Sequence, residues 1–152
     1  MLVAVDPGVH ACGVAVFLRG GQLERAAYVT CAGGGPVAVA GEVRDWFGSL
    51  VADRIVIERP QVYIPRLMKG DPNDLINLAM VVGALLATLH GPGETVLPAS
   101  WKGQVPKDIM VNRIKKRLAP EELARAMLPK TKDLQHNVFD AIGIGLWAVG
   151  RL

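Results

Sequence analysis

Apolar positions follow two different periods along the chain, and the period predicts which segments are strands and which are helices. Short apolar runs predict five strands, at 2–6, 12–18, 22–30, 54–58 and 95–98. Helical spacing predicts helices that begin at Pro36, span 73–90, run from near Pro106 to Leu118, begin at Pro120 and span about 135–150. Three antiparallel strands come first and parallel crossovers follow. This order predicts an α/β fold with a mixed five-stranded sheet flanked by helices.

The helix over 73–90 is predicted to have one apolar inner face. Its predicted inner face consists of Leu75, Leu78, Ala79, Val82, Leu85, Leu86 and Leu89. Met80 and Val81 are expected to be ordinary core residues. The prolines at 60, 65 and 72 bracket a long segment without periodicity, and long loops in compact domains usually serve a function.

Length and composition are those of one globular domain over residues 1–152. The chain is 51% apolar and 20% charged, which excludes a disordered protein. No apolar run reaches membrane-spanning length, and Asp6 interrupts the first run, so no signal peptide is expected. Cys12 and Cys31 lack metal-binding spacing. We therefore expect both to be small buried side chains in a reducing, cytoplasmic compartment.

Positive charge gathers in one segment of the chain. The whole sequence carries +3, but residues 101–132 hold nine basic and three acidic side chains, a net of +6 that leaves −3 elsewhere. Such clustering is typical of a phosphate-binding surface. A solvated helix face remains the open alternative.

Two predicted strands end in a carboxylate. Asp6 ends the first strand and Glu58 ends the fourth. If these strands are parallel neighbours, both side chains emerge at the edge where open α/β sheets bind ligands. Asp6 has a structural alternative, because an aspartate in a turn can accept hydrogen bonds from the amides of Gly8 and Val9. Asp140 adds a third carboxylate from an apolar helix, where a charged side chain needs a partner.

Three neighbouring carboxylates repel one another and therefore imply a cation. Oxygen ligands favour Mg²⁺ or Mn²⁺ over zinc. Two such ions about 3.5–4 Å apart can stabilise both the attacking and the leaving oxygen of a phosphodiester. His136 and Asn137 share the helix face of Asp140, and Asp133 shares it too if the helix begins early. The pattern predicts a metal-dependent nuclease.

Four segments carry a resemblance to a known family. VAVDPG, IVIERPQ, PASWKGQVPK and HNVFDAIGIGLW resemble motifs of the RuvC-type Holliday junction resolvases, in the ribonuclease H-like superfamily. They span nearly the whole chain in the expected order, and the WKG…PK form is similar to the phage-encoded branch. The resemblance implies a homodimer that binds four-way DNA junctions and makes a symmetric pair of nicks. It also implies two Mg²⁺ ions, replaceable by Mn²⁺, and the cytoplasm of a bacterial or phage-infected cell.

The resemblance also implies roles for single residues. Asp6, Glu58 and Asp140 match the catalytic, metal-binding carboxylates of the family. The family has Asp or His about three residues before the last Asp, and this chain has Asn137 there. We take His136 as the fourth catalytic and metal-binding residue, with Asn137 and Asp133 as open alternatives. The expected DNA-binding residues are Arg59, Tyr63, Arg66, Lys69, Lys102, Lys107, Arg113 and Lys116. The helix over 73–90 is expected to pack the dimer or to line the junction.

Three other functions are compatible with parts of the pattern. A different ribonuclease H-like nuclease, acting on structured RNA or branched DNA, would use the same metal chemistry. Actin-like ATPases and sugar kinases share the strand–Asp–turn–Gly opening, but they need two domains and this chain is too short. A junction-binding protein without activity would not require Asp6, Glu58 and Asp140.

Overall fold

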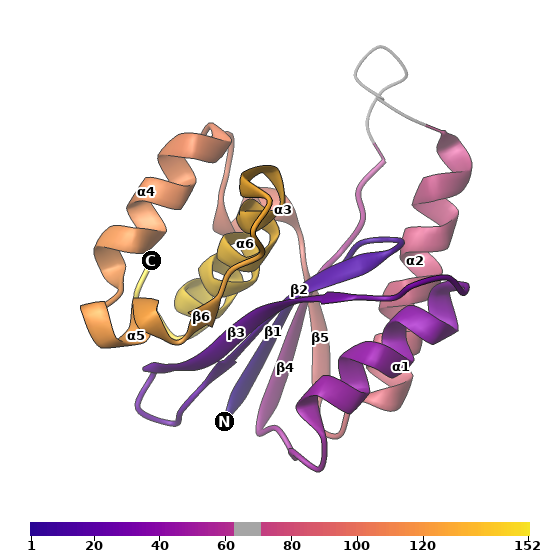
Figure 1. Ribbon diagram of the computed structural model, residues 1–152, viewed down its shortest axis with the longest axis horizontal. Coiled ribbons are helices and arrows are strands. Elements are labelled where there is room, and N and C mark those ends of the chain that lie inside the picture. Colours follow the sequence, from indigo (N-terminus) through magenta and orange to yellow (C-terminus); the bar gives the residue numbers. More distant parts are fainter. Residues whose placement is uncertain (63–70) are drawn as a thin grey trace.

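A six-stranded mixed sheet forms the centre of the computed structural model, which describes residues 1–62 and 71–152 (Figure 1). The spatial order is β5-β4-β1-β2-β3-β6, in which β1 to β3 are antiparallel neighbours and the three outer pairings are parallel. The strands are β1 (Leu2–Asp6), β2 (Ala11–Phe17), β3 (Leu23–Thr30), β4 (Arg54–Glu58), β5 (Gly93–Val96) and β6 (Ala126–Met127). The five predicted strands are confirmed. The prediction missed β6, because two residues are too few to show an alternating pattern.

The helices begin where prolines fix the backbone. Proline is favoured in the first helical turn because its missing N–H is not needed there, and it is the first residue of four of the six. The helices are α1 (Pro36–Phe47), α2 (Pro72–Thr88), α3 (Pro98–Trp101), α4 (Lys107–Arg117), α5 (Pro120–Ala124) and α6 (Lys132–Ala148). The short α3 was not predicted, and α6 begins three residues earlier than expected. Among the described helices, none is long and apolar enough to cross a bilayer.

The two faces of the sheet carry different helices. Figure 1 shows α3, α4, α5 and α6 on one side of the sheet and α1 and α2 on the other. Leu2, Ala4 and Val56 pack in the cluster that includes α6, whereas Val3 and Val5 pack in the cluster with α1 and α2. Side chains in a strand alternate between faces. Asp6 and Glu58 therefore continue the face that α6 covers.

Glycines allow α6 to lie close against the sheet. A Cβ added to Gly13 in β2 would stand 1.9 Å from the carbonyl oxygen of Asn137, and one added to Gly145 would stand 2.0 Å from the ring of Phe17. The helix backbone could not approach as closely with any larger residue at these positions. Gly13 is the register partner of Asp6, so this close approach occurs directly beside the first strand-end carboxylate.

The inner face of α2 differs from its predicted inner face. Val81, Val82 and Leu85 are buried in α2, but Met80 is 53% exposed and Leu86 is 37% exposed. The helix buries only the stripe that meets α1 and the sheet. Its high overall hydropathy therefore extended the predicted face too far. Of the two cysteines, Cys12 is buried and Cys31 is half-buried, and both are free thiols.

The ion pair between Glu122 and Arg151 joins α5 to the C-terminal residues of the chain. The Glu122 carboxylate accepts hydrogen bonds from the backbone N–H of Leu23 and Ala119, and its oxygen lies 2.7 Å from the Arg151 guanidinium. Arg151 lowers the pKa of Glu122 to about 2. The buried carboxylate thus ties the C-terminal residues and α5 to the β2–β3 hairpin.

Candidate active site

Parallel pairing brings two carboxylates to one edge of the sheet. Val5 is the register partner of Ile57, so Asp6 and Glu58 are the next residues of adjacent strands. Both side chains are half-buried. The predicted convergence of the two strand ends is confirmed.

Asp140 reaches the same place from α6. It is one of only two buried charged or polar residues identified in the described chain, and it is 8% exposed. Burial, together with repulsion from Glu58 and Asp140, raises the pKa of Asp6 well above 3.8. Lys102 and Lys107 act in the opposite direction. Glu58 and Asp140 are therefore close enough to disfavour the charge of Asp6.

Trp101 and Lys102 connect these carboxylates. The Trp101 indole Nε1–H donates a 2.6 Å hydrogen bond to Oε2 of Glu58. The Lys102 ammonium lies 3.3 Å from the same oxygen and 3.4 Å from Oδ2 of Asp140. Burial of the ammonium disfavours its charge, but attraction to Asp140, Glu58 and Asp6 outweighs this effect and raises the pKa of Lys102. Lys102 was predicted to bind DNA, whereas Trp101 was not predicted to lie in the site.

The donor chemistry of this cluster fits a hard divalent ion. Asp6, Glu58 and Asp140 offer only carboxylate oxygens, which Mg²⁺ and Mn²⁺ prefer. Within residues 1–62 and 71–152, however, no three His, Cys, Asp or Glu side chains form a group arranged to hold a metal ion. The Lys102 ammonium lies between two of the three carboxylates. The ligand types therefore fit a metal, while the side chains are arranged around an ammonium group.

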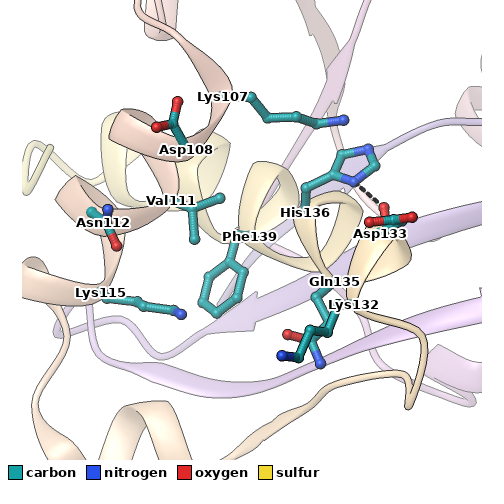
Figure 2. A pocket seen from close by; sticks show the side chains of 10 residues that line it. All are labelled: Lys107, Asp108, Val111, Asn112, Lys115, Lys132, Asp133, Gln135, His136 and Phe139. Carbon is teal, nitrogen blue, oxygen red and sulfur yellow. Dashed lines mark hydrogen bonds between the residues drawn. The ribbon is translucent and has the colours of Figure 1, made fainter.

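His136 lies on the side of the cluster that faces α4. Its Nδ1 makes a hydrogen bond with the carbonyl oxygen of Asp133 (Figure 2). A carbonyl can only accept, so Nδ1 carries the proton and Nε2 is left free for a ligand or a second proton. Burial and the charge of Lys107 lower the pKa of His136 from 6.5. The imidazole is therefore neutral at pH 7, as a metal ligand must be.

Asn137 and Asp133 occupy different surroundings. Asn137 lines a cavity of about 210 Å³ together with Asp6 and Tyr28. Asp133 is exposed in the first turn of α6. Two of the three possible fourth residues thus line different cavities, His136 with Lys107 and Asn137 with Asp6.

A cavity of about 530 Å³ lies between α4 and the start of α6 (Figure 2), and its charged lining consists of three lysines and the two aspartates Asp108 and Asp133. Lys107 and Lys115 border it from α4, and Lys132 and His136 border it from α6. The Lys115 ammonium lies 4.9 Å from the ring centroid of Phe139, within cation–π range. Lys115 and Lys132 were absent from the predicted DNA-binding set, although both belong to the basic segment. Arg113 and Lys116 are exposed on α4 and do not line the cavity.

The remaining predicted DNA-binding residues follow β4. Arg59 is exposed and lines a second cavity of about 330 Å³ with Glu58 and the start of α2. Tyr63, Arg66 and Lys69 lie outside the described residues.

Known structures share this architecture, although no protein-family model and no curated protein matches the sequence. Thermus thermophilus RuvC in complex with a Holliday junction substrate superposes with a TM-score of 0.67 and 15% identity, over 95% of this chain and 89% of that one. The chain has the fold of RuvC. The fowlpox virus Holliday junction resolvase superposes with a TM-score of 0.59 and 10% identity, over 99% of both chains. At these identities the likeness is one of fold, and it confirms the ribonuclease H-like architecture expected from the sequence.

Proposed function

We propose that this protein is a structure-selective endodeoxyribonuclease that resolves four-way DNA junctions by a symmetric pair of nicks. The observation that carries the proposal is the convergence of Asp6, Glu58 and Asp140 at the strand-end edge of a RuvC-like fold. The cavity that is lined by Lys107, Lys115 and Lys132 adjoins this cluster through His136. An acidic centre beside a basic surface suits a nuclease, since one binds metal and the other binds the phosphate backbone.

The proposed ligands of two Mg²⁺ ions, replaceable by Mn²⁺, are Asp6, Glu58, His136 and Asp140. Bound ions of this kind polarise the scissile phosphate and lower the pKa of a water nucleophile. The protein's own residues set the geometry. Trp101 holds Oε2 of Glu58 through its indole N–H, and Asp133 orients the His136 ring through Nδ1.

The proposed DNA surface extends from the site along α4. In this proposal Lys102 and Lys107 contact phosphates near the cut, and Arg59 contacts the DNA backbone beside β4. Arg113 and Lys116, which are exposed on α4, contact a junction arm. We add Lys115 and Lys132, because they line the same cavity as Lys107. Two symmetric nicks need two active sites related by a two-fold axis, and a homodimer supplies them.

A four-way junction with a mobile core tests the proposal. The protein is incubated with the junction and Mg²⁺, and nicks are mapped on all four strands. Paired nicks at symmetric positions in opposing strands are expected, with no cleavage by Asp6→Asn or in EDTA. An RNA–DNA hybrid and a three-way branched DNA are tested in parallel.

Two alternatives give different outcomes in the same assay. Preference for the hybrid or the three-way branch would indicate another ribonuclease H-like nuclease. Tight junction binding without nicks in either Mg²⁺ or Mn²⁺ would indicate a junction-binding protein without activity. Either result overturns the proposed resolution of four-way junctions.

A further inference from the structure

The Lys102 ammonium takes the position between two proposed metal ligands. Its Nζ lies 3.3 Å from Glu58 and 3.4 Å from Asp140, and the three side chains are only 26%, 15% and 11% exposed. An Mg²⁺ ion bound to both oxygens would lie about 2.0–2.1 Å from each. Such an ion would use the two oxygens that the ammonium already pairs with, and its double positive charge would repel the ammonium.

We infer that Lys102 competes with the divalent metal for Glu58 and Asp140, so that metal enters only as the ammonium leaves. A DNA phosphate is the group that receives the released ammonium. This inference rests on the proposed function, since it takes Glu58 and Asp140 as metal ligands. It adds that Lys102 makes metal loading depend on the presence of substrate.

The surroundings of the cluster indicate which group moves. Glu58 is held by the Trp101 indole, and Trp101 is buried against α6, where a Cβ on Gly143 would stand 2.5 Å from its ring. The Lys102 backbone N–H is bonded to the carbonyl of Pro98. The Lys102 ammonium is held at the end of a flexible four-carbon stem, and beyond these two carboxylates its recorded contact is with the Trp101 ring, whose centroid lies 4.7 Å away. Glu58 therefore has a second, buried partner in Trp101, whereas the lysine side chain can turn away.

Competition of this kind couples two binding events. Metal releases the ammonium for phosphate, and phosphate withdraws the ammonium from the carboxylates. By linkage, each ligand must tighten the binding of the other by the same factor. The protein without DNA thereby keeps Glu58 and Asp140 paired with the ammonium, and its metal affinity stays low until a phosphate is present.

Lys107 provides a matched control. Its charge also lowers the pKa of Asp6, but in the described part of the structure it makes no ion pair with a carboxylate, whereas Lys102 makes two. Removal of either lysine changes the net charge equally. Only removal of Lys102 vacates the position between Glu58 and Asp140.

The test is calorimetric titration of Mn²⁺ into wild type, Lys102→Met and Lys107→Met, each stripped of metal and free of DNA. Two partly buried ion pairs are lost on metal entry, so Lys102→Met should bind Mn²⁺ about tenfold more tightly than wild type. Lys107→Met should gain less than about threefold, from long-range charge alone. Equal gains in both variants, or no gain in Lys102→Met, would overturn the competition.

A measurement on wild type covers the case in which Lys102→Met fails to fold. The Lys102 ammonium is observed by ¹⁵N NMR and assigned by its absence in Lys102→Arg. Addition of Mg²⁺ should shift or broaden this signal, while the signal of the exposed Lys130, which precedes α6, stays in place. An unmoved Lys102 signal would contradict the inference. Neither measurement uses cleavage. Competition without nicks would refute only the proposed nuclease, and nicks without competition would refute only this inference.

Discussion

At the scale of single residues, Asp6 carries the largest electrostatic cost. Its pKa is raised well above 3.8 by burial and by Glu58 and Asp140, so the folded state favours the protonated acid. Without metal, this residue's contribution to stability is full below pH 3.8 and is lost as pH rises through the folded pKa. Asn does not ionise, so Asp6→Asn avoids this decrease in folding stability at high pH. At pH 7 in EDTA we expect the variant to be more stable by about 1 kcal/mol, or about 2–4 °C in Tm.

The same substitution separates stability from chemistry. Asp6→Asn keeps the shape of the side chain but removes one charge from the metal-binding cluster. Junction cleavage in Mg²⁺ should fall by at least about 10³-fold, while junction binding in EDTA stays within about twofold of wild type. Thermal melting at pH 4 and pH 7 and single-turnover cleavage check the two halves. Substantial cleavage by the variant would remove Asp6 from the site.

The choice between His136 and Asn137 also belongs to this scale. We expect His136→Ala to cost far more cleavage activity than Asn137→Ala, and His136→Asp to recover part of it, because a carboxylate can take the same Mg²⁺ position. Since the pKa of His136 is lowered from 6.5, wild-type cleavage should fall only as pH drops through a value below 6.5. Protonated imidazole cannot coordinate, which gives the sign of the change.

Single-turnover rates for the three variants at saturating protein, from pH 5 to 8, measure this directly. A greater loss in Asn137→Ala would assign the fourth position to Asn137, which lines the cavity beside Asp6. If the cleavage rate of His136→Ala still falls at low pH as it does in wild type, the titrating group is not His136.

At the scale of elements, Gly13 sets the distance between β2 and α6. Gly13→Ala would place a Cβ 1.9 Å from the Asn137 backbone, which no side-chain rotation can relieve, so α6 must shift. Overpacking of this kind costs about 1–3 kcal/mol. Because α6 carries Asp140 and His136, a shift of about 1 Å should also reduce cleavage by about 10²-fold.

The control for Gly13 is Gly83, which lies in the exposed interior of α2 with no atom within 4 Å of its added Cβ. Gly83→Ala should raise stability by up to about 1 kcal/mol through helix propensity, with no change in cleavage. Urea denaturation and initial cleavage rates for both variants test the pair. Destabilisation by both substitutions would deny any special role to the contact between Gly13 and α6.

The parts of the site that lie on long helices and strands were predictable from sequence. The parts that lie on the connection between β5 and α4 were not. Period-2 alternation placed Asp6 and Glu58 on one face, and the apolar pattern of α6 singled out Asp140. The hydrogen bond from Trp101 to Glu58 depends on the four-residue helix α3, which is too short to have a period. The position of Lys102 between two carboxylates depends on the same turn, so a lysine expected on DNA was found in the acidic cluster.

At the scale of the whole molecule, the sheet lies between α4, which belongs to the basic segment 101–132, and α1 (Figure 1). If the cavity between α4 and α6 follows a junction arm, Lys107→Ala and Lys132→Ala should each remove about one phosphate contact. Each loss reduces the magnitude of the slope of log K against log salt by about 0.9 for duplex DNA.

Arg44→Ala is the control variant. It removes the same charge from α1, on the other side of the sheet and away from the cavity, and should leave the slope unchanged. Junction affinities measured in EDTA from 50 to about 300 mM salt distinguish these cases. Equal slope changes in all three variants would mean that DNA responds to net charge alone, and unchanged slopes in both lysine variants would place the DNA elsewhere on the protein.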